Sequence, residues 1–317
     1  MMQFVIAETL EHALELMASG SRPIAGGTDL VVGARQGKEP LPDALVAIDR
    51  LGVLASIDGG TGEDGEIVIG ACVSHATIAG HGDIIDLVPG LADGSSLVGS
   101  PATRHVGTIG GNIMNASPAM DTGAPLLAAG AAVEVASTRG SRLLAVADLW
   151  LGPGQTSVDS DELCVAVHIP RPGPRTSSAY VRLEYRRTME IAVVGAGAQV
   201  SLSDDGSVAS ASVALTAVAP VIIAVQGLSE VVGLQPGEAA RTVARLASEQ
   251  SRPISDLRAS DRYRRHTVGV MASRAVLAAC RRAAGEEIAV PVNRSEGIGA
   301  GYPGDAVANT TADGVEL

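Results

Sequence analysis

The chain has 317 residues, of which 46% are hydrophobic, enough to bury a sizeable core and to exclude wholesale disorder. Its 35 acidic residues outnumber its 23 basic ones, and the formal charge of −12 argues against a surface that neutralises nucleic-acid phosphates. One Trp, one Phe and four Tyr leave little on which bases could stack. The length favours two domains.

The cysteines, histidines and apolar stretches exclude further classes of protein. Cys72, Cys164 and Cys280 lie far apart and are too few for a disulfide framework, a zinc site or an iron–sulfur cluster. The six histidines share no ligand spacing, so we predict no metal site. The N-terminus lacks the basic region of a signal peptide, and no apolar stretch reaches the length of a membrane span. We therefore expect a soluble, cytoplasmic protein.

The first part of the chain predicts helices and strands around a glycine-rich loop. Thr9 caps and Gly20 ends a predicted amphipathic helix. Its apolar face consists of Leu10, Ala13, Leu14 and Met17. The elements predicted next are strands at 22–25, 44–48 and 66–70 and helices at 30–36 and 84–97.

From residue 131 the pattern becomes strand-like and then breaks at a proline cluster. The strands expected here are 131–136, 143–146 and 163–169. Three prolines within 170–174 prevent a regular element, so we place a domain boundary there. The predicted units are a domain over 1–172, a domain over 175–288 and a flexible tail over 289–317. The second domain is predicted to contain strands at 179–186, 191–202 and 208–218 and helices at 238–249 and 261–284.

Two loops carry paired glycines beside a hydroxyl group. The first consists of Ala25, Gly26, Gly27, Thr28 and Asp29. The second consists of Thr108, Ile109, Gly110, Gly111 and Asn112. Paired glycines let backbone N–H groups approach an anion, and one ligand with two phosphates would explain both loops. The alternative for the first loop is a tight turn in which Asp29 caps the next helix.

Two other segments have competing interpretations. Asp121 follows the second loop and could hold a ribose hydroxyl, or it could cap a helix near 126–129. The stretch from Ile191 to Val200 looks like a dinucleotide-binding fingerprint, but Val200 occupies its third glycine position and no helix opens there. We interpret this stretch as a buried strand whose small residues let another backbone or a ring pack closely.

Together the motifs resemble one family. AGGTDL at 25–30, GTIGGN at 107–112 and ASPAMDTGAPLLAAGA at 116–131 resemble the FAD-binding medium subunit of molybdenum hydroxylases, the group of xanthine dehydrogenase and carbon monoxide dehydrogenase. The likeness extends to 139–142, 161–163, 186–196 and 261–264, and it covers about residues 2–285.

The resemblance implies an α+β fold and a set of FAD contacts. It implies a two-subdomain FAD-binding module of the vanillyl-alcohol-oxidase type, followed by an α/β domain with a three-stranded antiparallel sheet and helices. Residues 25–29 and 108–112 would wrap the FAD pyrophosphate, Asp121 would hold the ribose, and Cys164 would lie by the cofactor. Arg182 stands where many members have a Lys near the flavin edge, so the resemblance does not specify NAD use. No catalytic side chain is implied.

The resemblance also implies partners. A small subunit with two [2Fe–2S] clusters would pass electrons from a large molybdopterin subunit to the FAD of this chain, and from there to an external acceptor, in a dimer of heterotrimers. This chain has too few cysteines and too short a length to hold those other centres. Two alternatives remain open at this stage: a self-contained FAD-dependent oxidoreductase, and a nucleotide-binding regulatory or assembly protein without redox activity.

Overall fold

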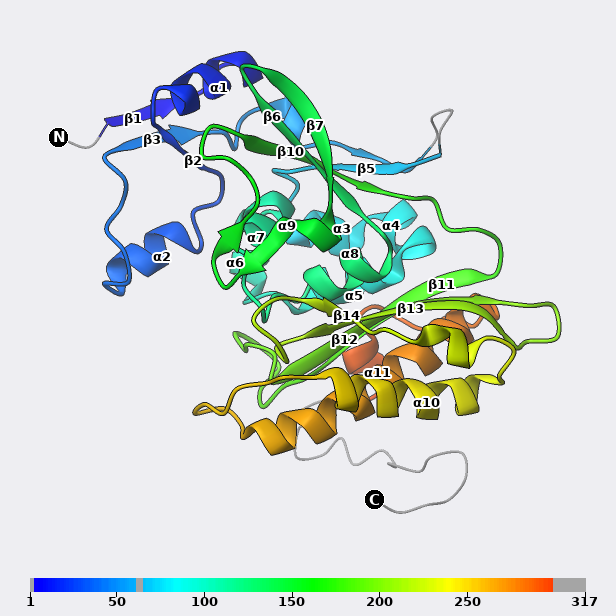
Figure 1. Cartoon of the computed structure of the whole chain (residues 1–317). Coiled ribbons are helices and arrows are strands. Elements are labelled where there is room, and N and C mark those ends of the chain that lie inside the picture. Colours follow the sequence, from blue (N-terminus) through cyan, green and yellow to red (C-terminus); the bar gives the residue numbers. More distant parts are fainter. Residues whose placement is uncertain (1–2, 61–64, 299–317) are drawn as a thin grey trace.

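The structure, a computed structural model, describes residues 3–60 and 65–298. It is built of three sheets that follow one another through the molecule, with a layer of short helices between the second and the third (Figure 1). The first two sheets belong to the N-terminal half of the chain, and the third belongs to the C-terminal half.

The first sheet is parallel, with the strand order β1-β3-β2. Its strands are β1 (Gln3–Ile6), β2 (Arg22–Ile24) and β3 (Ala44–Ala47), and the helices that connect them are α1 (Leu10–Ala18) and α2 (Leu30–Arg35). Thr9 caps α1 as predicted, because its side chain accepts a hydrogen bond from the backbone of His12. The predicted apolar face of α1 packs inward through Ala13, Leu14 and Met17.

The second sheet is antiparallel, with the strand order β4-β5-β10-β6-β7. Its strands are β4 (Ile57–Asp58), β5 (Ile67–Gly70), β6 (Ala132–Ser137), β7 (Gly140–Ala145) and β10 (Leu163–Ile169). A short 3-10 turn, η1 (Gly52–Leu54), leads into it, and β8 (Trp150–Gly152) pairs with β9 (Gln155–Thr156) in a separate ribbon.

Short helices cover one face of the second sheet. They are α3 (His75–Gly80), α4 (Gly82–Leu87), α5 (Pro89–Leu97), α6 (Pro101–Val106), α7 (Ile109–Met114), α8 (Gly123–Ala128) and α9 (Val146–Leu149). The single helical segment predicted at 84–97 is two helices, α4 and α5. The break falls at Val88, which leaves the helical region because Pro89 begins the next helix.

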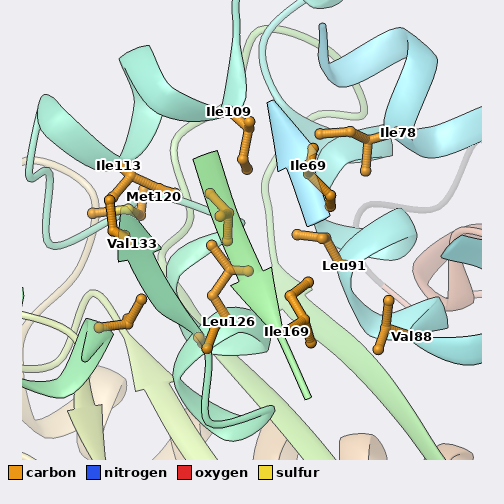
Figure 2. Packing of buried hydrophobic residues seen from close by; sticks show 14 of the residues in the cluster. Ile69, Ile78, Val88, Leu91, Ile109, Ile113, Met120, Leu126, Val133 and Ile169 are labelled. Atoms are coloured by element: carbon orange, nitrogen blue, oxygen red, sulfur yellow. The ribbon is translucent and has the colours of Figure 1, made fainter. Parts of the chain in front are cut away.

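The main core lies between the second sheet and these helices. Figure 2 shows strand side chains that meet helix side chains in this core. The strands contribute Ile69, Val133 and Ile169, and the helices contribute Ile78, Leu91, Ile109, Ile113 and Leu126. Burial of these branched side chains fixes α3, α5, α7 and α8 on the sheet.

The third sheet is antiparallel and has four strands, not the three that the resemblance implied. They are β11 (Thr176–Leu183), β12 (Val194–Leu202), β13 (Val208–Thr216) and β14 (Ile223–Ala224), in that order. The additional strand, β14, has only two residues, too few for a periodic sequence signal. The helical elements here are η2 (Leu228–Val231), α10 (Pro236–Gln250) and α11 (Asp261–Ala283), and α11 packs on β11 and β12.

The glycines of β12 have packing roles, as interpreted from the sequence. A Cβ on Gly197 would lie 2.7 Å from the backbone of Ala124, and one on Gly195 would lie 2.4 Å from the hydroxyl of Tyr180. The strand is buried and pairs with β11 and β13. Glycine therefore allows α8 and an aromatic ring to approach this sheet closely.

The segment predicted as a flexible tail is packed in its described part. Residues 289–298 contain α12 (Val292–Ser295), and Val292 and Asn293 are buried. The side chain of Asn293 bonds both backbone groups of Arg182, at 2.9 and 2.7 Å. Residues 299–317 lie outside the described residues. The polar composition that predicted a tail did not reveal this docking, because its contacts are to residues distant in the chain, such as Asp93 and Arg182.

A buried carboxylate connects the helical layer to the C-terminal sheet. Asp93 in α5 is fully buried and accepts two hydrogen bonds from the Arg282 guanidinium, at 2.7 and 3.1 Å. It also accepts from the backbone N–H groups of Tyr180 and Val292, at 3.1 and 3.0 Å. All four bonds join residue 93 to the part of the chain beyond residue 179.

Replacement of this carboxylate tests the connection. Asp93→Ala leaves the Arg282 charge without its buried carboxylate and two backbone donors without an acceptor, so we expect the free energy of unfolding to fall by about 3 to 5 kcal/mol. Urea denaturation measures the change. Arg245→Ala, which removes exposed ion pairs to Glu230 and Glu249, is the control and should change little. Equal stability of Asp93→Ala and the parent would contradict the connection.

Candidate functional site

The first glycine loop lies between β2 and α2 and leaves a run of backbone donors free. Gly27 has a φ of +65°, a conformation that favours glycine. Among the residues that the structure describes, the amide N–H groups of 26–29 make no hydrogen bond. Asp29 occupies the N-cap position of α2, as the alternative interpretation had it, but its side chain makes no capping hydrogen bond. Four consecutive N–H groups remain available to an anion.

The second loop uses its backbone donors within the protein. Thr108 is the N-cap of α7, and its Oγ1 accepts a hydrogen bond from the N–H of Gly111 at 3.1 Å. The N–H groups of Ile109 and Gly110 donate to carbonyl oxygens just after β5, at 3.0 and 2.9 Å. The N–H of Asn112 donates to the Thr108 carbonyl at 3.0 Å. This loop is therefore held rigidly, and its backbone donors from Ile109 to Asn112 are already satisfied.

The structure brings the two loops into contact. A Cβ on Gly26 would lie 1.9 Å from the carbonyl oxygen of Val106, so only glycine permits this approach. Thr28 Oγ1 lies 3.5 Å from the position that a Cβ on Gly107 would occupy. The free donors of the first loop therefore lie against the segment that leads into the second. The free N–H groups and the glycine contact together fit a bound pyrophosphate.

Asp121 and Arg182 form a buried pair. Asp121 Oδ2 accepts from Arg182 Nη1 at 2.7 Å, and Asp121 Oδ1 accepts from the Tyr180 hydroxyl at 2.9 Å. Arg182 Nε donates to Glu184 at 2.7 Å. Burial lowers the pKa of Arg182, but Asp121 and Glu184 outweigh burial and raise it above its usual range. Both oxygens of Asp121 are thus occupied, and its predicted ribose contact stays a prediction.

Cys164 lies inside the second sheet. It is buried in β10, opposite Val135 of β6. Burial raises the pKa of its thiol to about 12, with smaller contributions from Cys72 and Glu134. The thiol is therefore an inert packing group in this structure. Its predicted position beside the cofactor stays a prediction, as does the position of Arg182 near the flavin edge.

Sequence reasoning missed three residues around the second loop. Arg104 in α6 donates to the carbonyl of Val98 at 3.0 Å and has no ion pair in the described part of the chain. Met189 reaches across from the β11–β12 loop, and its N–H donates to the carbonyl of Gly99 at 3.1 Å. His75 begins α3 and is buried beside Gly107. Arg104 lies within the motif region, but no spacing in the sequence distinguishes His75 or Met189.

In the ranges 3–60 and 65–298, no group of three or more His, Cys, Asp or Glu side chains is placed to hold a metal ion. No helix in these same ranges is long and apolar enough to cross a membrane.

Comparison with protein families assigns most of the chain. Residues 1–172 match the FAD binding domain in molybdopterin dehydrogenase, and residues 179–279 match the CO dehydrogenase flavoprotein C-terminal domain. The chain belongs to this family of FAD-binding subunits. It is an oxidoreductase flavoprotein subunit of the xanthine and CO dehydrogenase type, which confirms the resemblance found in the sequence.

Individual relatives match over most of their length. The xanthine dehydrogenase FAD-binding subunit of Escherichia coli O157:H7 is 29% identical over 88% of this chain and 96% of its own. The carbon monoxide dehydrogenase medium chain of Afipia carboxidovorans is 31% identical over 85% of this chain and 92% of its own. The reconstituted CO dehydrogenase from Oligotropha carboxidovorans superposes with a TM-score of 0.83 at 30% identity, over 89% of this chain and 98% of that one.

The Gly26 contact leads to a test of the site. In Gly26→Ala the new Cβ collides with the Val106 carbonyl, so the first loop must shift and lose part of its donor set. Because one hydrogen bond to a charged group is worth about 1.5 to 3 kcal/mol, we expect FAD affinity to fall at least about tenfold. Titration of the FAD-free protein with FAD measures it. The matched control is Gly33→Ala in α2, where a Cβ meets nothing within 4 Å. Unchanged affinity in Gly26→Ala would contradict the site.

Proposed function

We propose that this chain accepts electrons from iron–sulfur clusters of a small subunit and passes them through FAD to an external acceptor, in a heterotrimer with a large molybdopterin subunit. The observation that supports it best is the run of four free N–H groups at 26–29, held against Val106 by a glycine contact. We further propose that residues 1–172 form the FAD-binding domain and residues 175–288 the domain beside it.

The chain's own residues would bind and orient the cofactor. The amides of 26–29 and the Thr28 hydroxyl would hold the pyrophosphate, and the second loop would support them as a rigid wall. Bound FAD supplies the capacity to take electrons singly and release them in pairs. By the resemblance, Val98 and Gly99 stand where larger residues can cover the flavin ring, and the N–H of Met189 from the β11–β12 loop donates to the Gly99 carbonyl beside them. No acid–base pair is needed for this role.

The subunit partners follow from the relatives' names. Two CO dehydrogenase relatives are named medium chains. By analogy we propose a smaller and a larger partner, assembled as a dimer of heterotrimers. The iron–sulfur clusters that the smaller partner would supply need thiolate ligands. The described part of this chain has only three free cysteines, two of them buried.

Purification tests this assembly. We expect the native protein to show flavin absorption, to release FAD on denaturation and to carry two further subunits with iron and molybdenum. A yellow single chain that reduces an acceptor with an organic donor would favour the self-contained oxidoreductase. A colourless chain that cannot take up FAD would favour a nucleotide-binding protein without redox activity.

The second loop has its own test. Gly111→Asp places a negative charge beside the proposed pyrophosphate, and a carboxylate in the first turn of α7 favours the helix, so the fold should survive. We expect the FAD content to fall sharply, while Gly111→Asn, which has the same shape without the charge, retains more. Flavin content per folded protein measures both. A normal content in Gly111→Asp would remove the second loop from the site.

A further inference from the structure

His75 is a buried polar residue that the proposed function does not yet use. Its side chain is 1% exposed, and its Nδ1 has no hydrogen-bond partner among the described residues. Its backbone N–H donates to the carbonyl of Gly107 at 3.1 Å, which fixes the start of α3 against the second loop. A buried polar atom without a partner destabilises the fold, so the presence of a histidine here requires an explanation.

The protonation of His75 follows from its surroundings. Burial first, and the nearby Arg104 charge second, lower the pKa of His75 to about 4, so the imidazole is neutral at pH 7. A neutral imidazole has one donor nitrogen and one acceptor nitrogen. A proton on Nδ1 would bury an N–H without a partner, whereas Nε2 is not fully buried, so a proton there can meet water or a ligand. We therefore assign the proton to Nε2.

The Cδ2 edge of the ring lies beside Gly107, near the place where the two glycine loops meet. The position that a Cβ on Gly107 would occupy lies 3.4 Å from His75 Cδ2, the atom bonded to Nε2, and 3.5 Å from Thr28 Oγ1. Nδ1 lies on the other side of the ring. In the described part of the chain, neither Nε2 of His75 nor the Thr28 hydroxyl has a hydrogen-bond partner. Two unused donors thus flank one small space next to the free N–H groups of 26–29.

We propose that His75 and Thr28 form a phosphate subsite, in which the Nε2–H of His75 donates a hydrogen bond to a pyrophosphate oxygen of FAD. This inference rests on the proposed function, since it places the FAD pyrophosphate at the first loop. The neutral ring adds a donor without adding a charge to the neighbourhood of Arg104. The glycine at 107 keeps the space between the two side chains open.

Three substitutions distinguish the effect of the His75 N–H donor from the effect of the side-chain shape. The Gln side chain of His75→Gln puts an N–H donor close to the position of Nε2, His75→Asn puts one close to Nδ1, and His75→Leu has none. The purified protein, with its accompanying subunits, is freed of FAD and titrated with FAD. We expect His75→Leu and His75→Asn to bind FAD about 10- to 100-fold more weakly and His75→Gln within about threefold of the parent.

Competition by ADP and by FMN tests whether His75 contacts the pyrophosphate of FAD. ADP carries a pyrophosphate and FMN does not. In competition with FAD, we expect His75→Leu to lower the affinity for ADP by the same factor as the affinity for FAD. Any affinity for FMN should stay unchanged. Loss of FAD affinity without loss of ADP affinity would overturn the pyrophosphate assignment.

The thermal stability of the FAD-free protein supplies a readout that a purely structural His75 would not give. His75→Leu removes a buried nitrogen without a partner, so its melting temperature should equal or exceed that of the parent while FAD affinity falls. A lower melting temperature with unchanged affinity per folded protein would overturn the proposal. A parent protein that fails to bind FAD would instead overturn the proposed function on which it rests.

Discussion

Two buried carboxylates connect the halves of this molecule, and the geometry of the site depends on them. Asp93 and Asp121 lie in the helical layer of the N-terminal half, yet the donors that satisfy them come from beyond residue 177. A buried carboxylate is tolerated only when its hydrogen bonds are complete, so the position of α5 and of the segment before α8 is tied to β11 and α11. The C-terminal sheet and α11 thereby fix α5 and the segment before α8, which precede and follow the second glycine loop in the chain.

The two glycine loops differ in how they use their backbone donors. The second loop has satisfied its donors from Ile109 to Asn112 through the Thr108 cap, the Thr108 carbonyl and the carbonyls after β5, and so it is rigid. The first loop leaves its donors free and is held in place from outside, by the contact of Gly26 with Val106. Because a donor used within the protein is lost to a ligand, a site needs both kinds of loop side by side.

Tertiary contacts give Arg182 a different role from the one that its position in the sequence suggests. The resemblance implies that Arg182 stands where many members of the family have a Lys near the flavin edge. In the structure it is completely buried between Asp121 and Glu184, which neutralise its charge at short range. Its main effect is therefore to hold β11 on the helical layer. Arg104, which makes no ion pair in the described residues, is the arginine whose charge helps to lower the pKa of His75 beside the second loop.

Local sequence by itself determined the elements with strong periodicity or turn chemistry, the Thr9-capped helix α1 and the glycine loops among them, and the three motifs in their order determined the family. It could not determine the two-residue strand β14, the docking of Asn293 or the pairing of Asp121, because each depends on residues distant in the chain. His75 carries no local signal at all. Only the tertiary structure decided which donors remain free for a ligand, because a hydrogen bond is satisfied by whichever group the fold brings within reach.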